Sequence, residues 1–215
     1  VHNFKATREG NTIYFERTTE AFKITHSYTY SGEGYGVDYN VNYENISNSP
    51  QDLTANIFMQ DAMSEVKTVD GGFLPGVPTG RPSLVVSAGD ESEHHDALSY
   101  CEDTEEKNAI ETSPAADINV IGLDRHYFVK ALVPDGQKFS YTLSKTERGG
   151  TQGCLFNITM GQKYGRIKSG QIVSMNMKSF FGPKDIDVLK AYDKNLTDTI
   201  DLGWFGWISQ PLLQA

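Results

Sequence analysis

The sequence predicts a mainly β protein, an antiparallel β-sandwich with one or two helices at its C-terminal end. Apolar and polar residues alternate in many short segments, clusters of Gly and Pro separate these segments, and no helical pattern lies between them until late in the chain. Alternation is typical of half-buried strands, and many such strands in succession indicate a sandwich. A chain of 215 residues can bury a sizeable core without cross-links.

The clearest strand signals come early. Phe22–Tyr30 places Phe, Ile, His and Tyr on one face and Lys, Thr and Ser on the other, and Val37–Glu44 alternates Val and Tyr with Asp, Asn and Glu. Ser31–Gly34 is a turn signal between them. The same pattern and the Gly and Pro clusters predict further strands at Leu53–Met59, Ser83–Ala88, Tyr127–Val133, Phe139–Ser144, Leu155–Met160 and Ile172–Phe181.

Two segments break the strand pattern. Asp90–Glu106 is acidic and polar, so we expect an exposed loop. Gly182-Pro183-Lys184 is expected to begin a helix, with Pro at its first position and Asp185 in its first turn. An apolar stripe at helical spacing follows and should pack on the sandwich: Val188, Leu189, Tyr192 and Leu196. We therefore expect a β-sandwich core over residues 1–181 and a C-terminal helical segment over residues 182–215.

The charge balance is acidic, with 28 Asp and Glu against 19 Lys and Arg and a net charge of −9. This argues against nucleic acid as a partner, which needs a basic surface, and against electrostatic docking of the whole surface on anionic lipid. No signal peptide begins at Val1, and no run of about 18 apolar residues could span a bilayer. The sequence as given predicts a soluble piece, and its end inside an apolar run is what excision from a membrane protein would leave.

The sequence contains little catalytic or metal chemistry. Asp90–Asp96 holds Asp, Glu and two adjacent His, but adjacent residues of an extended chain point in opposite directions and the spacing is not that of a metal site. We expect a solvated loop there. His26 and His126 lie on or beside strands with no nucleophile nearby in sequence, so hydrogen-bonded structural histidines are expected rather than catalytic bases. No catalytic residue, metal or cofactor is predicted.

The two cysteines, Cys101 and Cys154, lie far apart and form no CxxC spacing, which disfavours a zinc site. A disulfide between them needs an oxidising compartment, and a domain of this size does not require one. The sequence therefore leaves open whether they pair.

The last fifteen residues, Asp201–Ala215, hold both tryptophans and no basic residue. Asp201 can cap a helix, Pro211 would kink or end it, and helical spacing places these side chains along one side: Leu202, Phe205, Ile208 and Leu212. Burying one large apolar side chain is worth roughly 2–3 kcal/mol, so the segment should be covered. The cover is either the sandwich or a membrane surface, to which Trp is well suited.

Four C-terminal motifs occur in one order: Phe181-Gly182-Pro183-Lys184, Leu189-Lys190-Ala191-Tyr192, Asp201-Leu202-Gly203-Trp204-Phe205 and Ile208-Ser209-Gln210-Pro211-Leu212-Leu213. Two looser matches lie upstream, at Tyr35–Pro50 and Tyr127–Pro134. Together they resemble the large periplasmic domain of the YidC/Oxa/Alb family of bacterial membrane protein insertases. The resemblance implies a β-supersandwich of the galactose-mutarotase-like type with C-terminal helices. It also implies a place on the periplasmic face of the bacterial inner membrane.

The resemblance further implies a non-enzymatic accessory domain, because the family's insertion groove lies in transmembrane helices that this chain does not contain. The parent protein would insert and fold inner-membrane proteins, alone or with the Sec translocon, so its partners would be nascent membrane proteins and Sec components. The last residues would contact the bilayer surface as a hinge: Gly203, Trp204, Phe205, Gly206, Trp207, Ile208, Pro211, Leu212 and Leu213. The alternative function is a carbohydrate-binding module or mutarotase-like enzyme on the same sandwich, with convergent His and carboxylate side chains.

Overall fold

The computed structural model describes residues 3–30, 32, 34–64, 83–97, 109–125, 127–147 and 153–200 of the chain. Within these ranges it has strands β1 Lys5–Glu9, β2 Thr12–Thr18, β3 Phe22–Tyr30, β4 Gly36–Asn45, β5 Gln51–Ser64, β6 Ser83–Ala88, β7 Glu91–Asp96, β8 Ala109–Asp124, β9 Phe128–Pro134, β10 Lys138–Glu147, β11 Gly153–Ile167 and β12 Ile172–Pro183, helix α2 Ile186–Tyr192 and 3₁₀ helix η1 Lys194–Thr199. No helix in the described ranges is long and apolar enough to cross a bilayer.

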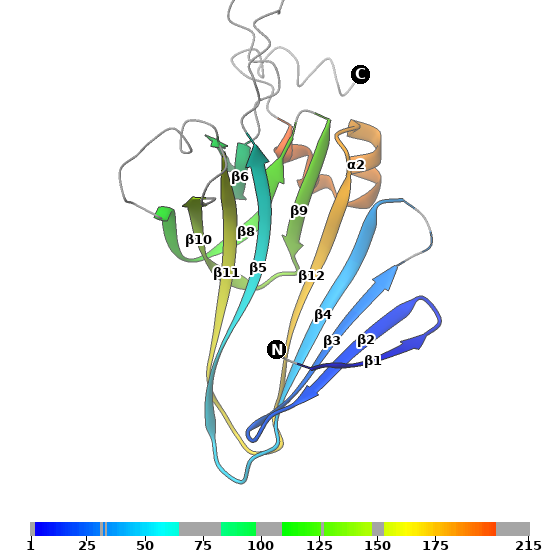
Figure 1. Cartoon of the computed structure of the whole chain (residues 1–215), viewed down its shortest axis with the longest axis vertical. Coiled ribbons are helices and arrows are strands. Elements are labelled where there is room, and N and C mark those ends of the chain that lie inside the picture. The colour runs from blue at the N-terminus through cyan, green and yellow to red at the C-terminus, as the bar shows by residue number, and fades with distance from the viewer. Residues whose placement is uncertain are drawn as a thin grey trace, which may run out of the picture.

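The strands pair in the order β1-β2-β3-β4-β12-β9-β8-β10-β11-β5, with β6 beside β8 and β7 beside β6. Strand β8 belongs to both layers, because its first part pairs with β10 and its second part with β6 and β9. Two layers result, with β4, β12 and β9 on one side and β10, β11 and β5 on the other (Figure 1). The predicted antiparallel sandwich is confirmed.

Apolar side chains from alternate strand positions fill the space between the layers. The first layer contributes Val41, Leu132, Met175 and Met177, and the second contributes Phe139, Leu143, Phe156, Ile158 and Met160. Each such burial contributes about 1.5–3 kcal/mol. The period-two pattern of the sequence therefore becomes the inner face of the sandwich.

The helices α2 and η1 cover a second, smaller core on the outer face of β9 and β12. Leu189 and Leu196 are fully buried there against Val129, Ala131 and Phe180, as the helical stripe predicts. The predicted start of the helix was wrong. Gly182 and Pro183 end β12, and α2 begins at Ile186, with the Asp185 carboxylate accepting from the backbone of the first turn.

The predicted loop at Asp90–Glu106 was also wrong in part. Residues 91–96 form β7, an edge strand hydrogen-bonded to β6. Its residues are all polar, namely acidic residues, His and one Ser, so no apolar alternation reveals it. Backbone pairing alone makes such a strand, and the side chains then point to alternate faces.

A buried amide holds the far end of the sandwich. The Asn45 side chain donates to the carbonyls of Ser49 and Ile167 at 2.9 and 3.0 Å and accepts from the backbone and hydroxyl of Ser47 at 3.0 and 2.7 Å. All its hydrogen-bonding groups are thus used, which is what a fully buried polar side chain requires. It ties the β4–β5 turn to the end of β11.

Candidate functional site

Three of the segments that resemble the insertase family meet at one place in the fold. Pro183 lies opposite Phe128 in the β12–β9 ladder, and the backbone N–H of Lys184 donates to the Tyr127 carbonyl at 2.9 Å. A Cβ added to Gly182 would lie 2.6 Å from Cβ and Cγ of Tyr35. Only glycine fits this contact, so the motif's residues join β9, β12 and the β3–β4 connection.

Lys184 has a distinct structural role. Its Nζ lies 2.7 Å from Oδ2 of Asp124, at the end of β8, and the two side chains are only 16% and 6% exposed. Burial raises the pKa of Asp124, an effect that the hydrogen bond and charge of Lys184 partly oppose. The ammonium therefore compensates a carboxylate that would otherwise be costly to bury.

Large apolar side chains are exposed around this junction. Tyr127 and Phe128 are 70% and 59% exposed, and Tyr35 and Phe181 are about half exposed. β9 begins and β12 ends at the end of the sandwich where α2 packs (Figure 1). This end thus presents aromatic rings beside the segment that leads to residue 200.

A cleft of about 620 Å³ opens between the two layers. One wall comes from β3, β4, β9 and β12 and consists of Tyr28, Tyr39, Lys130, Leu132, Ser179 and Phe181; the other is formed by residues 56–60 of β5. The volume lies within the range of about 300–1,000 Å³ that is usual for ligand sites. None of the described lining residues is His, Asp or Glu.

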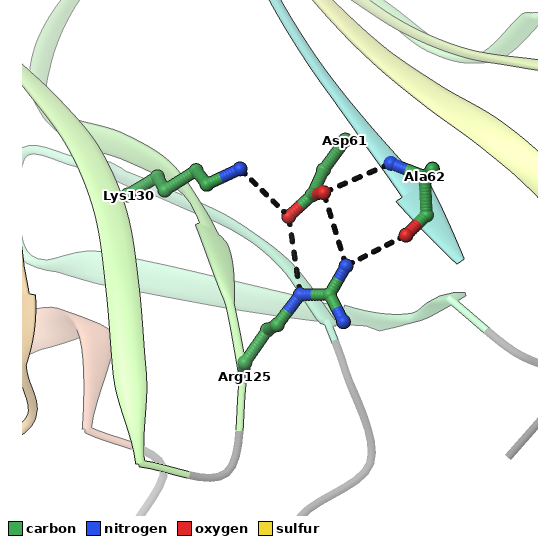
Figure 2. A network of polar contacts seen from close by, with 4 residues as sticks. All are labelled: Asp61, Ala62, Arg125 and Lys130. Carbon is green, nitrogen blue, oxygen red and sulfur yellow. Dashed lines mark hydrogen bonds and ion pairs between the residues drawn. The ribbon is translucent and has the colours of Figure 1, made fainter. Parts of the chain in front are cut away.

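A polar network joins β5 to the opposite layer beside this cleft (Figure 2). The Asp61 carboxylate accepts from Arg125 at 3.0 and 3.1 Å and lies 3.1 Å from Nζ of Lys130, while Arg125 also donates to the Ala62 carbonyl at 2.7 Å. Burial raises the pKa of Asp61, but the hydrogen bonds and charges of both cations outweigh it and leave this pKa below its usual value. The network thus links β5 to β9 and to the end of β8.

His26 lies in a structural environment, as predicted. Its Nδ1 is 2.7 Å from the Tyr39 hydroxyl, and its ring packs edge-on against Phe4. Burial lowers the pKa of His26, which favours the uncharged ring at neutral pH. His26 supports the cleft-lining Tyr39 without itself lining the cleft.

The acidic segment has one cluster of metal-ligand types. Nε2 of His95 lies 2.8 Å from Oε2 of Glu111 and 3.6 Å from Oε2 of Glu93, and Tyr141 donates to the other Glu111 oxygen. Sequence reasoning missed this grouping because Glu111 comes from another strand. An imidazole N–H directed at the two carboxylates accounts for these distances without a metal.

The predicted membrane-contact residues, from Gly203 to Leu213, lie outside the described residues, as does His126. Of the other predicted site residues, the structure places Gly182, Pro183 and Lys184 at the junction described above. Cys154 is buried and disulfide-bonded, and Cys101 lies outside the described ranges.

Comparison with known proteins identifies the domain. Residues 3–215 match the family described as the YidC periplasmic domain. The chain belongs to this family. The membrane protein insertase YidC of Pelobacter propionicus is 28% identical over 205 residues, a match that covers 94% of this chain and 34% of that protein. The chain thus spans about a third of the length of this relative.

The family match confirms the resemblance inferred from the C-terminal motifs. It also confirms the periplasmic location and the assignment to an insertase family rather than to an enzyme family.

Solved structures with a similar fold include proteins named as aldose epimerases or mutarotase-like proteins. A putative aldose 1-epimerase from Escherichia coli K12 superposes with a TM-score of 0.54 at 7% identity, covering 84% of this chain and 68% of that one. A galactose mutarotase-like protein from Lactobacillus casei gives 0.52 at 10% identity, covering 83% and 73%. Identities this low show a shared fold alone. They confirm the predicted galactose-mutarotase-like architecture.

Proposed function

We propose that this chain is the periplasmic accessory domain of a membrane protein insertase and helps inner-membrane proteins to insert and fold, alone or with the Sec translocon. The match to the YidC periplasmic domain over residues 3–215 is the observation that supports this most directly. The proposed clients are nascent membrane proteins, because the similar protein of Pelobacter propionicus is named a membrane protein insertase.

The role of the domain is positional. The sandwich over residues 1–181 is a spacer and contact surface, and residues 182–215 lead from it to the bilayer. The exposed rings of Tyr127 and Phe128 lie at the end from which this segment leaves, and aromatic rings are favoured at membrane interfaces. Trp204, Phe205 and Trp207 would extend that contact into the interface.

Vesicle flotation tests the membrane contact. The chain is compared with a Trp204→Ser/Trp207→Ser variant and with Ile172→Ser, which replaces a 57% exposed side chain at the other end of β12. We expect the double variant to lose binding to bilayers and Ile172→Ser to keep it. In the full-length insertase, the double variant should insert less client protein into proteoliposomes, and Ile172→Ser should insert as much as the unchanged protein. Equal flotation by all three proteins would remove the membrane-contact role.

The carbohydrate alternative is not favoured. The fold is similar to that of the aldose epimerase and mutarotase-like proteins. A carbohydrate site of that kind, however, would require ionisable side chains that converge on a concave face. The cleft lining has one Lys and no described His or carboxylate, and His95 with its acidic neighbours lies on β7 and β8.

A further inference from the structure

A cluster of ionisable side chains lies away from the cleft, between β7 and the first part of β8. One ligand atom from each of Glu93, His95 and Glu111 lies within 4.8 Å of the other two. Imidazole nitrogen and carboxylate oxygen are both ligands that divalent metal ions take in proteins. The cluster therefore has the composition of a three-ligand metal site.

The fold brings these three side chains together from both layers. Glu93 and His95 are alternate residues of β7 and lie opposite two residues of β6 whose side chains belong to the core between the layers. Glu111 lies opposite Leu143 of β10, whose side chain enters the same core from the second layer. Directly opposite residues of a ladder share a face. All three side chains therefore point inward and meet between the layers.

The distances within the cluster suit a zinc ion. Nε2 of His95 lies 2.8 Å from Oε2 of Glu111 and 3.6 Å from Oε2 of Glu93. Zinc is bound tetrahedrally, with bonds of about 2.0–2.2 Å to His nitrogen and carboxylate oxygen, so two of its ligand atoms lie about 3.4 Å apart. The two observed distances bracket this value, and small side-chain movements would equalise them. Three protein ligands would leave the fourth position to water.

Glu111 is held in place by a hydrogen bond from the second layer. The Tyr141 hydroxyl donates to the carboxylate oxygen that does not face His95. Burial, together with the hydrogen bond and charge of Glu111, raises the pKa of Tyr141 to about 12, so the hydroxyl keeps its proton at neutral pH. Carboxylates that bind metals are fixed by outer hydrogen bonds of this kind. The side chains of His95 and Glu111 are only 17% and 27% exposed, which limits competition from water.

The charge of the cluster favours a cation. Two carboxylates converge here, and no Lys or Arg among the described residues pairs with either of them. One imidazole can compensate at most one of the two negative charges. Inward-pointing charges on an edge strand also discourage pairing with other chains, but that role does not require side chains from two strands to converge on one point.

We propose that Glu93, His95 and Glu111 bind one zinc ion, which joins the two layers of the sandwich through β7 and β8. The imidazole already lies beside both carboxylates, so binding needs little rearrangement. Zinc takes the place of the ring proton at Nε2, which passes to Nδ1 or to solvent. The imidazole disfavours Ca²⁺ and Mg²⁺, because these ions take oxygen ligands. The site is independent of the proposed function, since it involves neither membrane contact nor client proteins.

Calorimetric titration of the untagged chain with ZnCl₂ tests the site. We expect saturable binding of one ion per chain and no comparable binding of CaCl₂. His95→Gln and Glu111→Gln should each weaken zinc binding at least tenfold, and Tyr141→Phe should weaken it about tenfold through loss of the outer hydrogen bond. His94→Gln is the matched control, because adjacent residues of a strand point to opposite faces, and it should bind zinc as the unchanged chain does.

Thermal unfolding provides a second measurement. A metal that binds only the folded chain stabilises it by mass action, so free zinc at a hundredfold excess over the dissociation constant should raise the melting temperature by about 5–10 °C. His95→Gln should abolish this rise, and His94→Gln should keep it.

X-ray absorption of the zinc complex of the unchanged chain should show one imidazole among oxygen ligands, a result that does not depend on the folding of any variant. The proposal would be overturned by a lack of saturable zinc binding, by equal binding of zinc to His95→Gln and the unchanged chain, or by a spectrum without imidazole nitrogen.

Discussion

The buried pair of Lys184 and Asp124 gives the sharpest prediction. Lys184→Met keeps the length and apolar stem of the side chain and removes its charge. The Asp124 carboxylate is 6% exposed, and its Oδ1 has no hydrogen-bond partner among the described residues. Removing one partner of a buried pair costs about 3–5 kcal/mol. For a domain of this size each kcal/mol corresponds to about 2–4 °C, so the melting temperature should fall by about 6–20 °C.

The cost should depend on pH in a defined direction. Burial already raises the pKa of Asp124 in the presence of Lys184, and without the ammonium it should rise further. A carboxyl with a raised folded-state pKa favours folding while protonated and loses that advantage as pH rises through the folded pKa. The difference between the two proteins should therefore be largest near pH 7.5 and should shrink as the pH falls towards about 4.5.

Urea unfolding followed by far-UV circular dichroism measures both effects. Lys178→Met is the matched control, because Lys178 pairs with Asp193 at 2.9 Å but is 47% exposed, and exposed pairs contribute about 0–1 kcal/mol. Asp124→Asn/Lys184→Met should recover much of the loss, since no charge then remains buried. A Lys184→Met variant as stable as the control, or a loss that does not shrink at low pH, would refute the reasoning.

Three further predictions concern the cleft network, the junction and the disulfide. Asp61→Asn should cost about 1–2 kcal/mol of stability near neutral pH, because the cationic partners of Asp61 are partly exposed. Since the pKa of Asp61 is lowered, this cost should disappear as the pH falls below the ordinary range of a carboxyl. Urea unfolding at neutral pH and below that range would show the change. Gly182→Ala should cost about 1–3 kcal/mol through overpacking against Tyr35, and unchanged thermal stability would contradict the contact. Peptide mapping without reductant should recover Cys154 linked to Cys101, and reduction should lower the unfolding free energy by about 2–4 kcal/mol; a free thiol at Cys154 would contradict the structure.

The sequence predicted those strands whose two faces differ in polarity. β3, β4 and β12 show clear alternation, and the inner residues Val41 and Met175 are fully buried. β8 has no such pattern, since Glu111 and Pro114 lie in its first half and its last five residues, 120–124, are all buried. β1 and β7 are edge strands without an apolar face. Backbone hydrogen bonds to a neighbouring strand form them, and this pairing produces no alternation of apolar and polar residues in the sequence.

The candidate sites were predictable to different degrees. The family resemblance found the Gly-Pro-Lys motif but assigned it to a helix start, because proline suits both a first helical turn and a strand end. Here the pairing of β12 with β4 ends at Phe180, while that with β9 continues to Pro183. Pro183 therefore needs no N–H on the β4 side. The cleft was not predictable, since five separate strands line it.

The C-terminal helices are anchored to the sandwich at several points. The Tyr192 hydroxyl donates to Asp38 on β4 at 3.3 Å, the Ser87 hydroxyl on β6 donates to Asp198 at 2.7 Å, and Leu196 is fully buried. Residue 200 is thereby held at a fixed place on the sandwich. Phe181, in the wall of the cleft, precedes the buried Lys184 by three positions, and Lys184 follows directly after the end of β12. The Lys184→Met variant tests the importance of this rigidity, because loosening the junction should impair client insertion by the full-length protein.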